Sequence, residues 1–141
     1  MDGESKILPH VFEISMGIDR SLYSLFENSS KYENQRFLLS LKPYLSPFHI
    51  AIFPLVNKNN LPELAYNIYE DLKLDFNAFY DESGSIGRRY RRQDQVGTPF
   101  CITVDFETLE SETVTLRNRD SMEQIRIPIK DIKAKLQNIK L

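Results

Sequence analysis

The fold is decided by residues 83–100, which read SGSIGRRYRRQDQVGTPF. A Gly/Ser turn opens this segment, four arginines follow within five positions, and an apolar strand comes next. On a helix three of the arginines lie within about 100° of one another, while Ile86 and Tyr90 face the other way. The pattern therefore predicts a helix with a cationic face and a buried face, which ends at Gly97-Thr98-Pro99. The four arginines are Arg88, Arg89, Arg91 and Arg92, of which Arg89 is the one outside the cationic arc.

These arginines indicate a polyanionic ligand. A guanidinium is a planar, permanently charged group that matches phosphate oxygens and base edges. A turn that leads into a helix adds unpaired backbone N–H groups. The local chemistry thus favours a nucleic acid. The alternative is a solvated helix face whose arginines form salt bridges with Asp81, Glu82 or Asp94.

The composition is that of one soluble globular domain with a local binding patch. The chain has 141 residues, of which 41% are apolar and 27% charged, and its net charge is −2. A negative net charge excludes a general electrostatic binder of nucleic acid and leaves a specific partner. The single cysteine, Cys101, excludes an internal disulfide and is expected in the core.

Targeting and metal signals are not evident in the sequence. No apolar run approaches the roughly 20 residues that span a bilayer, and no secretory signal is recognisable. Neither of the two histidines has a second ligand nearby, so neither a membrane nor a metal site is expected.

From residue 48 onward the hydrophobic pattern alternates between strands and helices. The expected order is β-α-β-α-β-β-β-α, which predicts an α/β fold: a three-layer α/β/α arrangement around a mixed five-stranded sheet. The expected strands are 48–55, 75–80, 100–104, 113–117 and 124–127, and the expected helices are a first from the cap Asn60, a second from the cap Ser85 and a closing one over 129–139.

The remaining segments give weaker signals. Residues 9–15 suggest a short strand, 17–27 an amphipathic helix, and 31–47 a linker on the surface. Residues 107–112 read as a solvated turn. Ligands of open α/β sheets collect beyond the carboxyl ends of the strands. Because residues 81–92 leave the end of the second strand, the arginines are expected at that edge.

Three ordered blocks of the chain resemble the C-terminal end of glycyl-tRNA synthetase, the class II enzyme of the archaeal, eukaryotic and dimeric bacterial type. The first block is DESGSIGRRYRRQD at 81–94, continuing through residues 97–100 to 103–106, and the last is RNRDSMEQ at 117–124. A further stretch at 9–20, PHVFEISMGIDR, is similar to motif 3 of class II synthetases. The resemblance runs from about residue 6 to the end.

The resemblance implies a division of the chain and several roles. Residues 1–30 would be the end of the catalytic domain, 31–47 a linker and 48–141 the anticodon-binding domain. In the family, the residue that matches Arg20 contacts ATP, and those that match Glu13 and Ser15 hold the glycine ammonium group. Ile14 departs from the family pattern, which usually has proline there, and this puts the local backbone in doubt.

The resemblance also implies a set of anticodon-binding residues. Arg88, Arg89 and Arg92 would contact phosphates, and polar groups near the strand ends would read bases. Two interpretations stay open for Asp94 and Asp105, which either accept hydrogen bonds from cytosine amino groups or partner arginines. Tyr90 and Phe100 are expected in the core, with base stacking as the alternative. The full candidate set is Ser85, Arg88, Arg89, Arg92, Asp94, Phe100 and Asp105.

The expected partner is tRNA-Gly, bound by the C-terminal part of a cytoplasmic, homodimeric glycine–tRNA ligase. That enzyme uses ATP and Mg²⁺, whereas this chain is expected to need no cofactor. Motifs 1 and 2 are not recognisable, so the chain by itself is not expected to activate glycine. The family dimerises mainly through surfaces of the catalytic domain, so the chain by itself is expected to be a monomer. The alternatives are a non-catalytic accessory or regulatory RNA-binding module and a module whose arginines bind an acidic protein.

Overall fold

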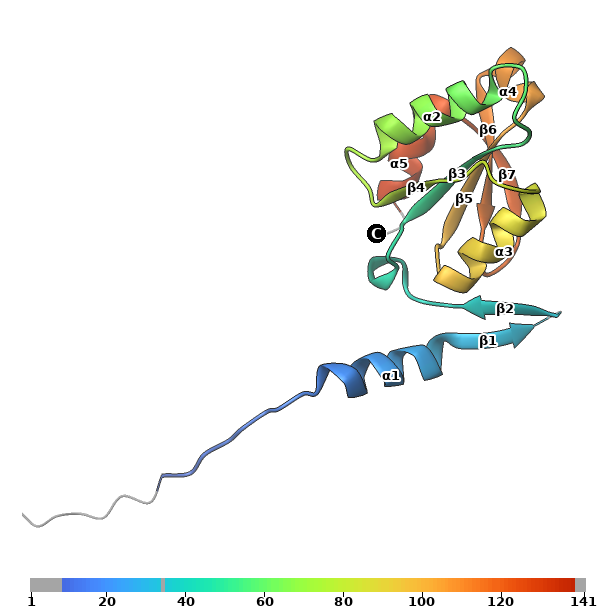
Figure 1. Cartoon of the computed structure of the whole chain (residues 1–141). Coiled ribbons are helices and arrows are strands. Elements are labelled where there is room, and N and C mark those ends of the chain that lie inside the picture. The colour runs from blue at the N-terminus through green and yellow to red at the C-terminus, as the bar shows by residue number, and fades with distance from the viewer. Residues whose placement is uncertain (1–8, 34, 139–141) are drawn as a thin grey trace, which may run out of the picture.

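The computed structural model describes residues 9–33 and 35–138, and it contains the predicted α/β domain (Figure 1). A five-stranded mixed sheet has the order β4-β3-β5-β6-β7. The strand β3 pairs in parallel with β4 and with the central strand β5, and the last two pairings, β5–β6 and β6–β7, are antiparallel. The strands are β3, Ile50–Pro54; β4, Ala78–Tyr80; β5, Phe100–Val104; β6, Thr113–Asn118; and β7, Gln124–Pro128.

Helices cover both faces of this sheet, as predicted (Figure 1). The helices α2, Leu61–Leu72, and α5, Ile132–Gln137, lie on one face, and α3, Ile86–Val96, lies on the other. The last residue of the predicted closing helix, Ile139, lies outside the described residues. Two parallel strands covered on both sides favour apolar side chains, and Thr103 is the single polar residue of β3 and β5.

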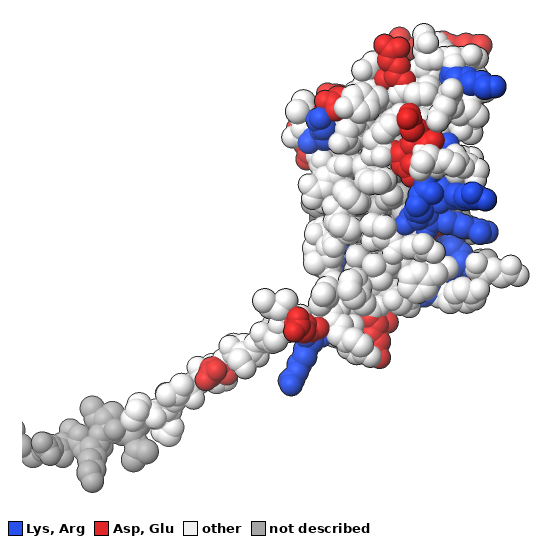
Figure 2. Space-filling view, viewed as in Figure 1, with Lys and Arg blue, Asp and Glu red and all other residues white. Residues whose placement is uncertain are grey.

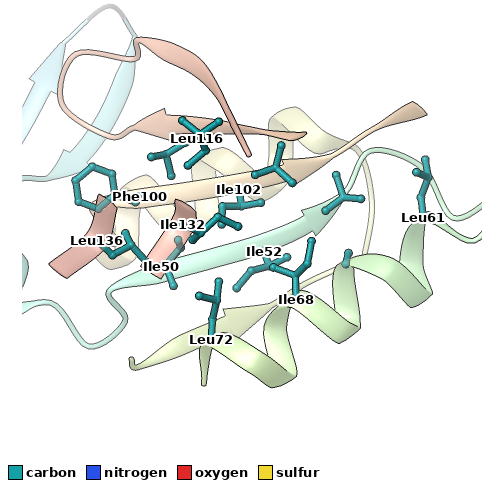
Figure 3. Close-up of a cluster of buried hydrophobic side chains, with 14 residues drawn as sticks. Ile50, Ile52, Leu61, Ile68, Leu72, Phe100, Ile102, Leu116, Ile132 and Leu136 are labelled. Atoms are coloured by element: carbon teal, nitrogen blue, oxygen red, sulfur yellow. The ribbon is translucent and has the colours of Figure 1, made fainter. Parts of the chain in front are cut away.

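The alternation of side chains along each strand sorts the core into two clusters. Ile50, Ile52 and Ile102 point toward α2 and α5 in the larger cluster, which Figure 3 shows. Ala51 and Phe53 point to the other face, where Ile86 and Tyr90 of α3 pack against them. Each fully buried aliphatic side chain contributes about 1.5–3 kcal/mol to folding. The larger cluster therefore supplies most of the apolar stabilisation.

Two predicted N-cap residues stand at the predicted positions, but neither side chain makes the capping hydrogen bond. Asn60 precedes α2 in a left-handed conformation, with φ 59°, and its side chain makes no capping hydrogen bond. Ser85 precedes α3 in extended backbone, and its side chain also makes no capping hydrogen bond. Pro62 stands in the first turn of α2, where a missing N–H costs nothing.

A helix replaces the solvated turn that the acidic run predicted. The helix α4, Phe106–Ser111, begins after a capping box in which the Asp105 carboxylate accepts from the Thr108 backbone N–H at 3.0 Å. The Thr108 hydroxyl accepts in return from the Asp105 N–H at 3.0 Å. The signal was present in the sequence, because Asp and Thr three residues apart can satisfy two helix-terminal donors at once.

The N-terminal region differs most from expectation. Residues 9–17 form no strand, because no neighbouring strand pairs with them, and Phe12 is 88% exposed. The helix α1, Ile18–Ser29, is present as predicted. The predicted linker instead contains an antiparallel hairpin, β1, Ser30–Glu33, with β2, Arg36–Leu39.

This hairpin is fastened to α3 and β6 through one buried carboxylate. Asp94 of α3 is 1% exposed, and its oxygens accept from Arg117 Nη1 at 2.9 Å, from Arg117 Nη2 at 3.2 Å and from Arg36 Nη1 at 2.9 Å. The Arg36 guanidinium also donates to the Arg119 carbonyl at 2.9 Å. Asp94 thus joins a helix, a sheet strand and the hairpin.

We expect Asp94→Asn to lower the free energy of unfolding by about 3–5 kcal/mol, because it leaves the buried Arg117 guanidinium and the partly buried Arg36 guanidinium without a counter-charge. Urea unfolding followed by circular dichroism measures the change. Asp71→Asn is the matched control, since that carboxylate is 63% exposed and pairs with Lys133. Its cost should stay below about 1 kcal/mol, and equal costs for the two variants would contradict the assignment.

A second prediction concerns pH. Hydrogen bonds from Arg126, opposed by partial burial, lower the pKa of Asp105 from 3.8 to about 2. A depressed folded-state pKa stabilises the protein above the unfolded value of about 4, and this gain of about 2 kcal/mol disappears as the pH falls toward 2. Asp105→Asn keeps a capping side chain and removes the charge. The stability gap between parent and variant should therefore narrow between about pH 5 and pH 2.5, and a gap independent of pH would refute this.

Candidate nucleic-acid interface

The outward face of α3 carries an open cationic surface. Arg88 and Arg91 are exposed, and no carboxylate among residues 9–33 and 35–138 forms an ion pair with either. Figure 2 shows Lys and Arg side chains gathered over this side of the domain. The Arg92 side chain adds to the surface and is 43% exposed. The salt-bridged alternative is therefore wrong for Arg88 and Arg91.

Arg89 does not belong to this surface, which corrects the prediction that it contacts phosphate. It is 2% exposed, and its guanidinium donates to the Pro54 carbonyl and, at 2.9 Å, to the Gly84 carbonyl. Helical periodicity gives the reason, because Arg89 follows the inward-facing Ile86 by three positions. Arg91, which belongs to the predicted cationic arc but not to the predicted set of binding residues, is exposed.

The Arg92 side chain is partly exposed to solvent and also forms an ion pair within the protein. Its guanidinium pairs with the Asp81 carboxylate, with Nε at 3.1 Å, and also donates to the Ser83 carbonyl at 2.9 Å. Burial raises the pKa of Asp81, but the hydrogen bonds from Arg92 and Ser83 outweigh burial and leave it below its usual value. Arg92 therefore stabilises the turn before α3, and its positive charge is only partly available to a ligand.

Neither candidate acidic residue is available as a free base-reading group. Asp94 is enclosed between Arg36 and Arg117 and does not reach the surface, so the prediction that it reads a base is wrong. Asp105 caps α4 and accepts from both Arg126 terminal nitrogens at 2.8 Å, with 20% of its side chain exposed. For both residues the alternative interpretation, as partners of arginine, describes the observed contacts.

The two candidate aromatic residues lie away from the cationic surface. Phe100 begins β5, at the opposite end of the sheet from Asp105, and belongs to the cluster beneath α2 and α5. It lines a cavity of about 270 Å³ together with Leu116 and Ile125. Tyr90 points inward from α3, where its hydroxyl bonds the Thr103 hydroxyl and the Arg117 guanidinium lies 4.7 Å from its ring centre. Both residues are therefore core residues, as the sequence favoured.

A second cavity lies where the predicted ligand edge was expected. The segments that follow β3 and β4 meet at the carboxyl ends of these parallel strands, and they line an open pocket of about 470 Å³. Ser85, an exposed residue of the predicted set, stands in its wall at the start of α3. The cavity is lined by Leu55, Val56, Asn57, Glu82, Gly84, Ser85, Ile86 and Arg89.

The three residues matched to a catalytic site stand apart from this interface. Glu13 and Ser15 are exposed on the extended segment before α1, and Arg20 is exposed in the first turns of α1. Within the described chain, no helix has the length and apolarity to cross a membrane. The described residues also contain no cluster of three His, Cys, Asp or Glu side chains suited to a metal.

Relatives of the chain share its sequence over nearly its whole length. The glycine–tRNA ligase of Borrelia hermsii is 46% identical over 132 residues, which are 90% of this chain and 30% of that protein. That of Borreliella burgdorferi is 51% identical over 134 residues, 92% of this chain and 30% of that protein. That of Thermococcus gammatolerans is 47% identical over 135 residues, 95% of this chain and 24% of that protein.

Among solved structures, the RNA binding domain of threonyl-tRNA synthetase from Cryptosporidium parvum Iowa II has a similar fold. The TM-score is 0.64 at 19% identity, and the match covers 71% of this chain and 25% of that chain. The chain thus spans less than a third of the length of the relatives that it matches. A family model described as anticodon binding domain matches residues 49–139, which include the whole five-stranded sheet and α3. With the fold, the sequence blocks around the arginines and this match in agreement, the chain belongs to the anticodon-binding domain family.

Proposed function

We propose that this chain is the anticodon-recognising part of a glycine–tRNA ligase and that the outward face of α3 binds the anticodon loop of tRNA-Gly. The observation that carries the proposal is the exposed pair Arg88 and Arg91, whose charges are not neutralised by any described carboxylate. Two free guanidinium groups one helical turn apart suit successive phosphates of a nucleic-acid backbone.

Binding at this surface divides into two tasks. Arg88, Arg91 and the exposed part of Arg92 contact phosphates and set the register of the RNA, without reading its sequence. Unpaired bases of the loop then reach the polar groups at the strand ends, where Ser85 is exposed. The binding energy orients the tRNA and selects it, whereas the chemistry of aminoacylation takes place elsewhere.

In the longer enzyme that we propose, glycine is attached to tRNA-Gly with ATP and Mg²⁺. Arg20 would then contact ATP, and Glu13 and Ser15 would hold the glycine ammonium group. The described residues do not build such a site alone, because all three are exposed and nothing described packs around them. We therefore assign no catalytic step to this chain, and we expect it to be a monomer when isolated although the enzyme is a homodimer.

We expect Arg88→Ala and Arg91→Ala each to weaken binding of tRNA-Gly and to reduce the slope of log affinity against log salt by about one unit, because each removes one phosphate contact. Fluorescence anisotropy at several salt concentrations measures both quantities. Lys73→Ala is the control, since this exposed cation lies at the end of α2 on the other face of the sheet. Variants that bind like the parent at every salt concentration would remove α3 from the interface.

We also expect tRNA-Gly to bind more tightly than the same tRNA with a changed anticodon. Each lost base contact typically costs about 1–3 kcal/mol, so a difference in affinity of about fivefold or more is expected. The same anisotropy assay, with both RNAs at one salt concentration, gives this ratio. Equal affinities would show that the chain holds RNA without reading the anticodon.

A further inference from the structure

The cavity beside Phe100 takes no part in the interface proposed above. It has a volume of about 270 Å³ and lies at the amino end of β5, on the face of the sheet that α5 covers. The arginines of α3 stand on the other face (Figure 1). A cavity of this size is at the lower end of the range for ligand sites and suits a small molecule.

The floor of this cavity is apolar. Phe100 and Leu116 close it, and they are 7% and 3% exposed. Figure 3 shows Phe100 at one end of the core cluster. Ile125 pairs with Leu116 across β6 and β7, forms a wall of the cavity and is 38% exposed. A ligand that covers this wall with an apolar group gains free energy from the burial of both surfaces.

The rim of the cavity carries two opposite charges. Glu123 comes from the turn between β6 and β7, and Lys135 comes from α5. Both side chains are exposed, and neither forms an ion pair with any residue that the structure describes. The two charges are therefore available to groups of opposite sign on a ligand.

The turn that supplies part of the rim is held in one shape. The Asn118 Oδ1 accepts from the Asp120 N–H at 2.8 Å and from the Ser121 N–H at 3.1 Å. The Asn118 N–H donates to the Glu123 carbonyl at 3.0 Å, and the Ser121 hydroxyl accepts from the Glu123 N–H at 3.2 Å. Asn118 keeps its NH₂ group as a donor toward a ligand. A rim fixed before binding loses little conformational entropy when the ligand arrives.

These groups match the parts of one small molecule. Glu123 would accept from an α-ammonium group, and Lys135 with the Asn118 NH₂ group would hold an α-carboxylate. An apolar side chain between the two charges would cover the floor. A phosphate group, by contrast, would meet the Glu123 carboxylate and be repelled.

We propose that this cavity binds a free α-amino acid with an apolar side chain. The inference goes beyond the proposed function, because glycine has no side chain to cover the floor and is not expected to bind here. The C-terminal residue of another polypeptide would offer the same carboxylate and side chain without the ammonium group. Glu123 therefore distinguishes these two sources of the ligand.

Titration of the isotope-labelled chain with L-leucine, followed by NMR, tests the site. A dissociation constant of about 1 mM is expected for a ligand of this size, with resonances of Leu116 and Ile125 shifted. Glycine should cause no saturable shift. N-acetyl-L-leucine lacks the ammonium group and L-leucinamide lacks the carboxylate, so each should bind about three- to fivefold more weakly.

Four variants assign the contacts. Glu123→Gln should bind L-leucine and N-acetyl-L-leucine equally, and Lys135→Gln should bind L-leucine and L-leucinamide equally, because each removes the charge that senses the difference. Ile125→Trp should abolish binding, since the larger side chain fills the cavity. Leu74→Trp, at a residue 76% exposed beyond α2, is the matched control and should keep the parent affinity.

Two results would overturn the inference. One is the absence of saturable binding at roughly 10 mM L-leucine, ten times the expected dissociation constant. The other is a parent chain that binds N-acetyl-L-leucine as tightly as L-leucine, which would assign the cavity to a polypeptide C-terminus. Since Glu123 and Lys135 are exposed, their variants are expected to fold and keep the test decisive if Ile125→Trp does not. Binding of tRNA-Gly is measured separately, so failure of either proposal leaves the other standing.

Discussion

The ion pairs around the Asp94 carboxylate are the constraint on which the arrangement of the domain depends. One buried carboxylate holds Arg36 of the hairpin and Arg117 of β6 while it belongs to α3 itself. The Arg117 guanidinium also lies over the Tyr90 ring, so the same contact packs α3 against the sheet. With its inner face held in this way, α3 can present only its outer face to a ligand.

That anchoring explains how a chain of net charge −2 can carry a cationic surface. Asp81 and Asp105 form ion pairs with Arg92 and Arg126, and Asp94 is shared between Arg36 and Arg117, so these acidic groups are taken up by arginines of the fold. Arg88 and Arg91 are left in excess on one helix face. The field that a polyanion meets is set by this local imbalance and not by the total charge.

The fold could be predicted from the sequence wherever the spacing of apolar residues stays regular along a whole helix or strand. The apolar runs of β3 and β5, the helix start before Pro62 and the alternation in β6 and β7 each specify their element locally. The hairpin was missed because its strands are four residues long and depend on Arg36 reaching Asp94, 58 positions away. The strand expected over residues 9–15 failed for the related reason that a strand needs a partner, which no described residue supplies.

The sequence by itself determined that α3 exists, that it is amphipathic and that it follows a parallel strand at the ligand edge of an α/β sheet. It also determined the family, because ordered blocks of residues carry that information without any geometry. Only the tertiary structure decided what each charged side chain does. Arg89 turned inward, and Asp94 was enclosed between Arg36 and Arg117. The physical reason is that local pattern fixes which face of an element is buried, whereas the partner that a charge finds depends on segments brought together only by folding.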